Sequence, residues 1–177
     1  MARVLLVSGS LRRGSTNGAA LTALAEADLP GVEVDAYEGL RGLPHFDPDD
    51  DVAPLPPAVS ALRAAIAASD AVLFCTPEYA GTLPGSFKNL LDWCVGGVEL
   101  GDRPVAWINV ATSPLGGVGA HETLRVVLGY VGATIVEEAC VHVPVGRGDV
   151  GPDGRISDPE LRADLAGALA ILAGYRR

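Results

Sequence analysis

The sequence predicts an α/β fold, in which a doubly wound, five-stranded parallel sheet of strand order 2-1-3-4-5 carries helices on both faces. Short apolar runs alternate with segments of helical periodicity along the chain, in the order β-α-β-α-β-α-β-α-β-α. Most of these runs are continuously apolar, as expected of central parallel strands that are buried on both faces. The second run alternates apolar and charged residues, which suits its edge position. Without a repeat, low-complexity tract or linker, residues 1–177 are expected to form a single domain.

The first half of the chain supplies two strands and two helices. Residues 4–7 are an unbroken apolar run, and a helix with one apolar face is expected from about Thr16 to Asp28. Apolar and acidic residues alternate over 32–36, and a loop rich in Pro and Asp is expected from about Tyr37 to Pro56. The next helix has apolar residues at i, i+3 and i+7, namely Val59, Leu62 and Ile66.

The second half continues the alternation. Ala71–Cys75 and Val105–Ala111 are expected to be buried strands, each followed by an amphipathic helix. The first of these helices begins near Pro84, where the missing N–H of proline costs little. A last strand is expected at Ala139–Val143, and Ser157-Asp158-Pro159-Glu160 matches a capping box that begins the final helix.

Charge and cysteine content restrict the function class. The chain has 22 acidic and 13 basic residues, a net charge of -9, which argues against binding to nucleic acid or to anionic membrane surfaces. No apolar stretch approaches the ~20 residues that span a bilayer, and the N-terminus leads directly into a strand instead of a signal peptide. Cys75, Cys94 and Cys140 lack C-x-x-C spacing and are typical of structural thiols in a reducing compartment. A cytoplasmic protein is therefore expected.

Two segments rich in glycine and polar groups, Gly9–Asn17 and Thr76–Asn89, follow the first and third strands. In a sheet of order 2-1-3-4-5 the connections reverse direction between these two strands, and ligands bind at the carboxyl ends of the strands there. Sequence pattern and topology therefore place one ligand site at the same edge of the sheet.

The first segment is suited to holding a phosphate. It offers the hydroxyls of Ser10, Ser15 and Thr16 and the amide of Asn17, and Arg12 adds a charge-assisted, bidentate contact. Backbone N–H groups at the start of the following helix also favour an anion. The segment has neither G-x-G-x-x-G nor the G-K-[ST] of a Walker loop. The alternative is a polar turn in which Ser15 or Asn17 is only a helix cap.

The second segment is suited to lying against a flat ligand. Pro77 and Gly81 allow a tight turn, Tyr79 can cover one face of a ring, and the N–H groups of residues 79–82 are not obstructed by bulky side chains. The alternative is an ordinary loop with a tyrosine packed on the core. We interpret Glu78 as orienting this loop or pairing with a neighbouring subunit, in preference to acting as an acid or base.

Other polar groups carry weaker signals. The glycines of Thr112–Gly119, after the fourth strand, allow backbone to approach the open side of a ring, although a plain loop fits them as well. The acidic cluster at 47–51 lacks the pattern of a metal loop and is expected to be solvated. The histidines have no zinc-ligand spacing, and no G-x-S-x-G elbow is present. The sequence therefore predicts no metal site and no catalytic side chain.

These motifs resemble those of the NADPH-dependent FMN reductase family, flavodoxin-like proteins that include quinone, chromate and azo-dye reductases. Ser10-x-Arg12-x-x-Ser15-x-Asn17 matches the family's phosphate loop. Pro77-Glu78-Tyr79-x-Gly81 with Pro84-Gly85-x-x-Lys88-Asn89-x-x-Asp92-Trp93 matches its second motif, which is long and quite specific. Ser113 with the following glycines fits the third motif more loosely. The resemblance covers most of the chain.

The resemblance implies a flavodoxin-like, FMN-dependent NAD(P)H oxidoreductase in which the cofactor carries the chemistry and no protein acid or base is needed. NADPH or NADH would be the co-substrate, and a quinone, free flavin or similar small molecule would be the acceptor. The family commonly has Asn where this chain has Ala80, so one side-chain contact near the ring would be missing. By resemblance, the FMN phosphate would be held by Ser10, Arg12, Ser15, Thr16 and Asn17, and the isoalloxazine would be lined by Pro77, Glu78, Tyr79, Ala80, Gly81 and Ser113.

The resemblance also bears on assembly, and two alternative functions stay open. Family members commonly pair, and the apolar segment Trp93–Val98 favours a homodimer or homotetramer. A flavodoxin-type electron carrier is an alternative that the acidic charge would suit, although such carriers lack an equivalent of Arg12. A family member that has lost flavin and serves as a scaffold is the other alternative.

Overall fold

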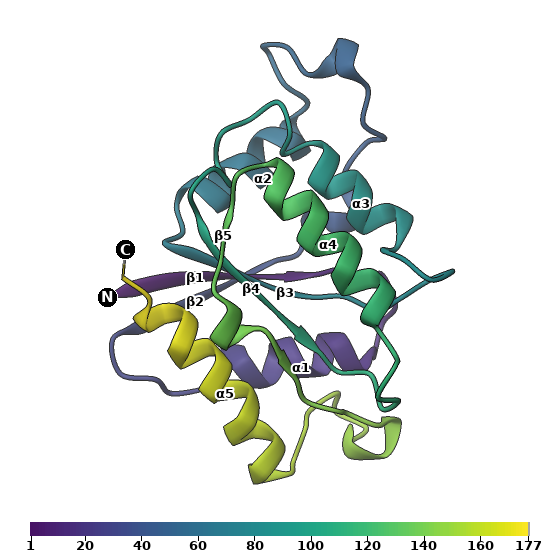
Figure 1. The fold of residues 1–177 in the computed structure, drawn as a ribbon, viewed down its shortest axis with the longest axis vertical. Coiled ribbons are helices and arrows are strands. Elements are labelled where there is room, and N and C mark those ends of the chain that lie inside the picture. The colour runs from purple at the N-terminus through teal and green to yellow at the C-terminus, as the bar shows by residue number, and fades with distance from the viewer. Residues whose placement is uncertain (177) are drawn as a thin grey trace.

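The computed structural model describes residues 1–176 and confirms the predicted strand order (Figure 1). The strands of the sheet follow the order β2-β1-β3-β4-β5, and each pair of neighbouring strands in this order is parallel. A further short strand, β6, also pairs with β4 in parallel. The strands are β1 (Ala2–Ser8), β2 (Val32–Tyr37), β3 (Ala71–Cys75), β4 (Pro104–Asn109), β5 (Thr134–Ile135) and β6 (Val141–His142).

Helices cover both faces of the sheet, with α1 and α5 on one face and α2, α3 and α4 on the other (Figure 1). Successive residues of a strand point to opposite faces, so Leu6 of β1 joins the core beneath α1 and α5, whereas Leu5 and Val7 join the other core. The helices are α1 (Thr16–Ala25), α2 (Pro57–Ala67), α3 (Gly85–Asp92), α4 (Val118–Tyr130) and α5 (Pro159–Gly174), with 3-10 turns η1 (Gly39–Gly42), η2 (Pro48–Asp50), η3 (Glu137–Ala139) and η4 (Arg147–Asp149).

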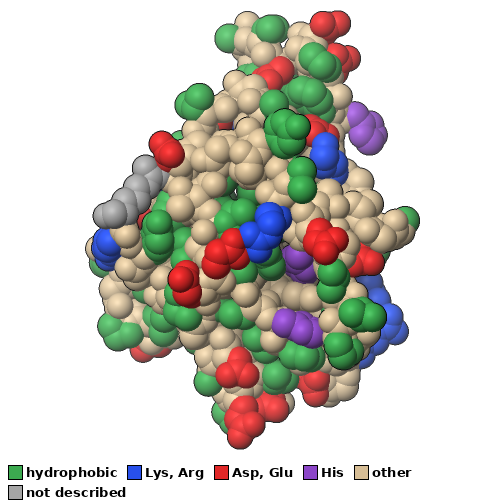
Figure 2. All heavy atoms as spheres, viewed as in Figure 1, with side chains coloured by type: hydrophobic (Ala, Val, Ile, Leu, Met, Phe, Trp, Pro, Cys, Tyr) green, Lys and Arg blue, Asp and Glu red, His purple; other side chains and the backbone are tan. Residues whose placement is uncertain are grey.

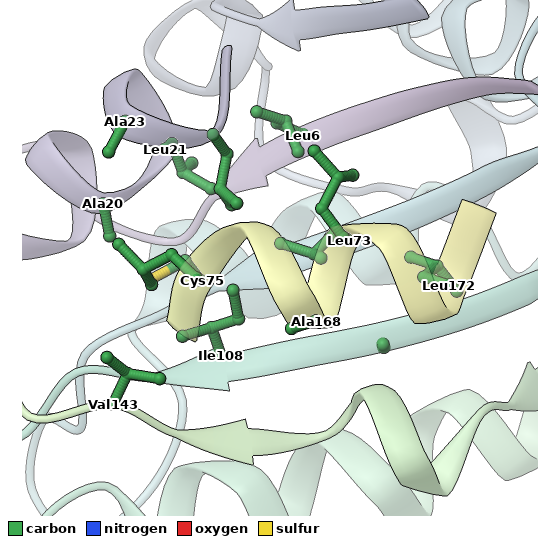
Figure 3. Close-up of a cluster of buried hydrophobic side chains, with 14 of the residues drawn as sticks. Leu6, Ala20, Leu21, Ala23, Leu73, Cys75, Ile108, Val143, Ala168 and Leu172 are labelled. Atoms are coloured by element: carbon green, nitrogen blue, oxygen red, sulfur yellow. The ribbon is translucent and has the colours of Figure 1, made fainter. Parts of the chain in front are cut away.

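The core beneath α5 explains why the central strands are apolar without interruption. Leu6, Leu73 and Ile108 come from three strands of the sheet and lie near Ala168 and Leu172 of α5 (Figure 3). Each of the five is at most 2% exposed. Truncating a buried leucine of this kind to alanine costs about 2–5 kcal/mol, so these residues fix the sheet that supports the loops at its carboxyl edge.

The structure corrects three details of the predicted elements. The first helix ends at Ala25, three residues before Asp28. The single last strand expected at Ala139–Val143 is instead two short strands, β5 and β6. The turn η3 separates them, and its 3-10 backbone interrupts the ladder along β4. The cap of α5 is Asp158, whose side chain accepts from the Glu160 N–H, so the expected capping box on Ser157 is not formed.

The loop between β2 and α2 is held by α3 and α2. Of the acidic cluster that the sequence predicted to be solvated, Asp47, Asp49 and Asp50 are exposed, whereas Asp51 is not. Asn89 Nδ2 and Trp93 Nε1 both donate to the Pro44 carbonyl, at 2.8 and 2.9 Å. Asp51 forms an ion pair with Arg63 at 2.7 Å, in which both side chains are only 11% exposed. Asn89 and Trp93 belong to the second motif, and their role here is structural.

Acidic side chains are dispersed over the face of the molecule seen in Figure 2 and do not gather in one patch. Within residues 1–176, no helix is both long and apolar enough to cross a bilayer.

Candidate functional site

The loop after β1 is organised by short-range hydrogen bonds. Ser8 Oγ accepts from the Ser10 N–H at 3.1 Å, and Ser10 Oγ accepts from the Arg12 N–H at 3.2 Å. Ser15 is the N-cap of α1, because its Oγ accepts from the Gly18 N–H at 3.0 Å. In these bonds the oxygens of Ser10 and Ser15 accept, so their hydroxyl hydrogens remain available to an anion. The helix cap offered as an alternative role of Ser15 is therefore compatible with phosphate binding.

Asn17 is oriented by a buried thiol. It is 6% exposed, and its Oδ1 lies 3.3 Å from Cys75 Sγ, which donates to it. Burial raises the pKa of Cys75 to about 12, so the thiol keeps the proton that it donates. The bond occupies the carbonyl end of the amide and leaves Nδ2, with its two N–H donors, for a ligand.

Residues Tyr79–Thr82, after β3, form a hairpin with a two-residue turn. The Tyr79 N–H donates to the Thr82 carbonyl at 2.9 Å, and the Thr82 N–H donates back at 3.1 Å. The two central residues have positive φ, 51° at Ala80 and 77° at Gly81, as in a type I′ turn. Asn-Gly is the favoured pair in this turn, because Asn tolerates the left-handed region better than Ala does. The backbone conformation of this turn therefore gives a reason for the Asn that the family commonly has at the position of Ala80.

Glu78 connects this hairpin to α4. Its Oε2 accepts from the N–H groups of Gly119 and Ala120, at 2.9 and 3.4 Å. The N-cap of α4 is Gly117, which has no side chain to cap the helix, so the carboxylate of Glu78 takes that part and faces the positive end of the helix dipole. These contacts support the interpretation of Glu78 as a residue that orients the loop.

The loop after β4 is fixed from two sides. Asn109 Nδ2 donates to the Gly116 carbonyl at 2.8 Å, and its Oδ1 accepts from the Ala111 N–H at 3.0 Å. From α4, His121 Nδ1 lies 2.6 Å from the Gly117 carbonyl. Burial lowers the pKa of His121, which favours the neutral ring with its proton on Nδ1. Neither Asn109 nor His121 was among the predicted site residues.

The three loops surround a cavity of about 390 Å³ at the carboxyl ends of β1, β3 and β4. Glu78 lines an adjoining cavity of about 360 Å³, which shares Thr16, Asn17 and Pro77 with the first. Ala80 and Gly81 line neither cavity, because they form the exposed tip of the hairpin. The remaining predicted residues all line the first cavity: Ser10, Arg12, Ser15, Thr16, Asn17, Pro77, Tyr79 and Ser113.

The cavity also has walls that the sequence reasoning missed. Gly146 and Arg147, at the start of η4, line it, and Arg147 is the second arginine of this cavity after Arg12. Topology contained a signal for them, since the segment after the last strand of a parallel sheet reaches the same edge as the other carboxyl ends. Val110, Ala111 and Thr112 complete the wall contributed by the third loop.

The residues present fit a ligand with a phosphate at one end and a flat ring at the other. Arg12, Arg147, the serine hydroxyls and the first turn of α1 form a donor set for a phosphate. Tyr79, which is 52% exposed, and the small side chains around Ser113 form walls for a ring. Phosphorylated aromatic cofactors such as FMN have this shape.

Comparisons with known proteins agree with this geometry. The family model of NADPH-dependent FMN reductase matches residues 2–147. A probable NADPH:quinone oxidoreductase of Oryza sativa is 34% identical over 188 residues, which cover 98% of this chain and 88% of that protein. An NAD(P)H-dependent FMN reductase of Pseudomonas aeruginosa is 32% identical, with 90% and 87% covered.

Among solved structures, FerB, a flavoenzyme NAD(P)H:(acceptor) oxidoreductase from Paracoccus denitrificans, has a TM-score of 0.83 at 28% identity and covers 97% of this chain and 96% of its own. The family match includes every residue that the phosphate loop, the hairpin and the third loop contribute to the cavity. The chain belongs to the NADPH-dependent FMN reductase family.

Proposed function

We propose that this protein is an FMN-dependent NAD(P)H oxidoreductase that passes hydride from the nicotinamide to FMN and then to a quinone, a free flavin or a similar small acceptor. The observation that carries the proposal is one cavity that joins the phosphate donors of the first loop to the walls of the second and third loops. Family membership supports the same cofactor and co-substrate.

In this proposal the first loop binds the FMN phosphate. Arg12 supplies charge, and Ser10, Ser15, Thr16 and Asn17 supply hydrogen-bond donors, with the Asn17 amide oriented by Cys75. Pro77, Tyr79 and Ser113 lie against the isoalloxazine, and Glu78 holds the hairpin and the third loop in place around it. Ala80 and Gly81 act through the shape of the turn and the position that it gives Tyr79.

Bound FMN would supply the redox chemistry, by taking hydride from NAD(P)H and passing it on to the acceptor. The chain supplies position and electrostatics. Glu78 is already engaged with the N-terminus of α4, so it serves to position the loops and is not assigned a proton. Tyr79 is half exposed at the rim, which leaves a face where the nicotinamide and then the acceptor bind in turn.

Relatives support a small-molecule acceptor. The rice relative is named as a probable NADPH:quinone oxidoreductase, and a relative from Burkholderia, 31% identical over 169 residues, is named 2-hydroxy-1,4-benzoquinone reductase. A planar quinone also suits the place that a nicotinamide ring would leave. We therefore assign a quinone as the preferred acceptor class.

A homodimer or homotetramer in the cytoplasm is part of the proposal. In the apolar segment after α3, Trp93 and Cys94 are buried, whereas Val95 and Val98 are 61% and 85% exposed. Exposed apolar residues in such a segment support contact with another subunit. Light scattering at micromolar concentration is expected to give a dimer or tetramer mass, and a monomer mass would contradict this part of the proposal.

The function is tested with the FMN-reconstituted protein under anaerobic conditions. NADPH or NADH is expected to bleach the flavin absorbance, and a quinone is expected to restore it over repeated turnovers. A yellow protein whose flavin is reduced only slowly by both NADPH and NADH would be an electron carrier of the flavodoxin type. A protein that binds no flavin under any condition would be a scaffold. Either result would overturn the proposed enzyme.

A further inference from the structure

A second, larger cavity adjoins the phosphate loop on the side away from the hairpin. It measures about 880 Å³ and lies between α1 and β2, with Leu21 of α1 and Ala36 of β2 among its walls. Ser10 and Arg12 line both this groove and the proposed FMN cavity. The two spaces are therefore neighbours along the carboxyl edge of the sheet, and nothing in the proposed function uses the groove.

The groove is basic at the end that meets the phosphate loop. Arg12, Arg13 and Arg41 line it there and are exposed, and within residues 1–176 none of the three forms an ion pair within 4.0 Å. Arg41 is held against the phosphate loop, since its Nη2 donates to the Leu11 carbonyl at 2.6 Å. Glu38 is an acidic wall residue, which leaves three guanidinium groups against one carboxylate.

The opposite end of the groove does not cancel this charge. Glu26 lines it there but is paired with Arg155 at 2.8 Å and Arg162 at 3.4 Å. In a chain of net charge -9, a groove with a local excess of arginine is suited to an anionic ligand. Its size is that of a pocket for a nucleotide-sized molecule.

We propose that this groove binds the 2′-phosphoadenosine half of NADPH, with Arg13 and Arg41 recognising the 2′-phosphate. The proposal rests on the proposed function, because it needs the nicotinamide half to lie at the FMN cavity. The shared wall at Ser10 and Arg12 gives the dinucleotide a continuous path between the two spaces. Guanidinium groups bind phosphate bidentately, so two unpaired arginines distinguish NADPH from NADH, which has only a hydroxyl at that position.

The test compares kcat/KM for NADPH and NADH on the FMN-loaded protein. We expect wild type to favour NADPH, and Arg13→Ala and Arg41→Ala each to lower the NADPH-to-NADH ratio about tenfold, as the loss of a charge-assisted hydrogen bond implies. Arg176→Ala removes an exposed charge near the opposite end of the strands and is expected to leave the ratio unchanged. The probe 2′,5′-ADP should inhibit wild type more strongly than 5′-AMP, and this difference should shrink in both groove variants.

A variant without charge change tests the groove itself. Ala36 is exposed on the edge strand, so Ala36→Trp should fold, fill the groove and raise KM for both nicotinamides. Wild type with no preference for NADPH, or a ratio that neither arginine variant moves, would overturn the inference. A third result would also overturn it: wild type binds FAD more tightly than FMN, and Ala36→Trp abolishes this preference without changing the NADPH-to-NADH ratio. The groove would then bind the adenosine of FAD. Flavin that neither nicotinamide reduces would instead overturn the proposed function.

Discussion

Two regions of the site are built by different kinds of contact. One is the phosphate loop, Gly9–Asn17, and the other is the ring wall, formed by the hairpin Tyr79–Thr82 and the loop between β4 and α4. In the phosphate loop, the hydrogen bonds of Ser10 and Ser15 join residues two or three positions apart in the chain. In the ring wall, Glu78 bonds Gly119 across 41 positions, and Thr82 Oγ1 lies 2.9 Å from Thr123 Oγ1 across another 41. The serine bonds of the phosphate loop are local, although Asn17 and Leu11 of that loop also accept bonds from Cys75 and Arg41, 58 and 30 positions away. The two long-range bonds of the ring wall depend on α4 having packed beside the hairpin.

The difference predicts how the two regions respond to change. A phosphate-side variant removes one contact to one part of the cofactor and leaves the other loops in place. A ring-side variant that breaks a long-range bond disturbs two loops together. Flavins with and without a phosphate separate these cases, because riboflavin has the ring of FMN but not its phosphate.

Arg12→Ala is expected to have the largest effect on cofactor binding and to act on the phosphate side alone. Loss of a charge-assisted hydrogen bond should weaken FMN by about 1.5–3 kcal/mol, which is about ten- to a hundredfold in Kd. Riboflavin affinity and the melting temperature should stay near wild type, because Arg12 is exposed. Fluorescence titration with both flavins measures this, and an unchanged Kd for FMN would show that Arg12 is only a surface residue.

Glu78→Ala should act on the ring side and weaken FMN and riboflavin by the same factor. Removing the carboxylate that caps α4 should also lower stability by about 2 kcal/mol, which differential scanning calorimetry would detect. Glu78→Gln keeps an oxygen acceptor for the Gly119 N–H and serves as the matched control, with a smaller loss. A Glu78→Ala variant that weakened FMN but not riboflavin would contradict the division between the two regions.

Gly81→Val should disturb the rim of the cavity but spare the phosphate side. A β-branched residue at φ 77° costs about 1 kcal/mol. A Cβ at Gly81 would meet no other atom within 4 Å, so the effect comes from strain in the turn that carries Tyr79. The variant should therefore retain FMN yet be reduced more slowly by NAD(P)H. Stopped-flow bleaching under anaerobic conditions measures that step, and a wild-type rate would show that the hairpin does not shape the ring site.

His121, which supports the loop after β4, should make the stability of the protein depend on pH. Burial lowers its pKa below the usual 6.5, so between the lowered value and 6.5 the unfolded chain binds the proton more readily than the native chain does. The native state should lose stability as pH falls through that window, and the contribution should be fully present above it. The melting temperatures of wild type and His121→Gln at pH 8 and pH 5.5 test this, since the variant should show a smaller loss. An equal loss would exclude His121 as the cause.

Ala80→Asn should have the smallest effect and should be favourable. Asn fits the left-handed turn at φ 51° better than Ala does, by roughly 0.5 kcal/mol. A rise of about 1–3 °C in the melting temperature would follow. A fall would mean that the conformation of the turn is not what this position requires.

The same division explains what the sequence revealed. The strand order follows from the alternation of short apolar runs with helical segments, and its prediction is confirmed. The role of the phosphate loop rests on residues close together in the sequence and stays a prediction. The cap that Glu78 places on α4, the support from Asn109 and His121, and the contribution of Arg147 depend on which elements pack together. The last strand was misplaced because η3 divides it, and apolar runs alone do not show that division.

The relative affinity of the wild-type protein for FMN and riboflavin tests the central claim most directly. If the phosphate lies in the loop from Ser10 to Asn17, FMN should bind at least about tenfold more tightly than riboflavin, because the donors of that loop contact only the phosphorylated flavin. Equal Kd values for the two flavins would contradict the assignment of this loop and the placement of the cofactor that follows from it.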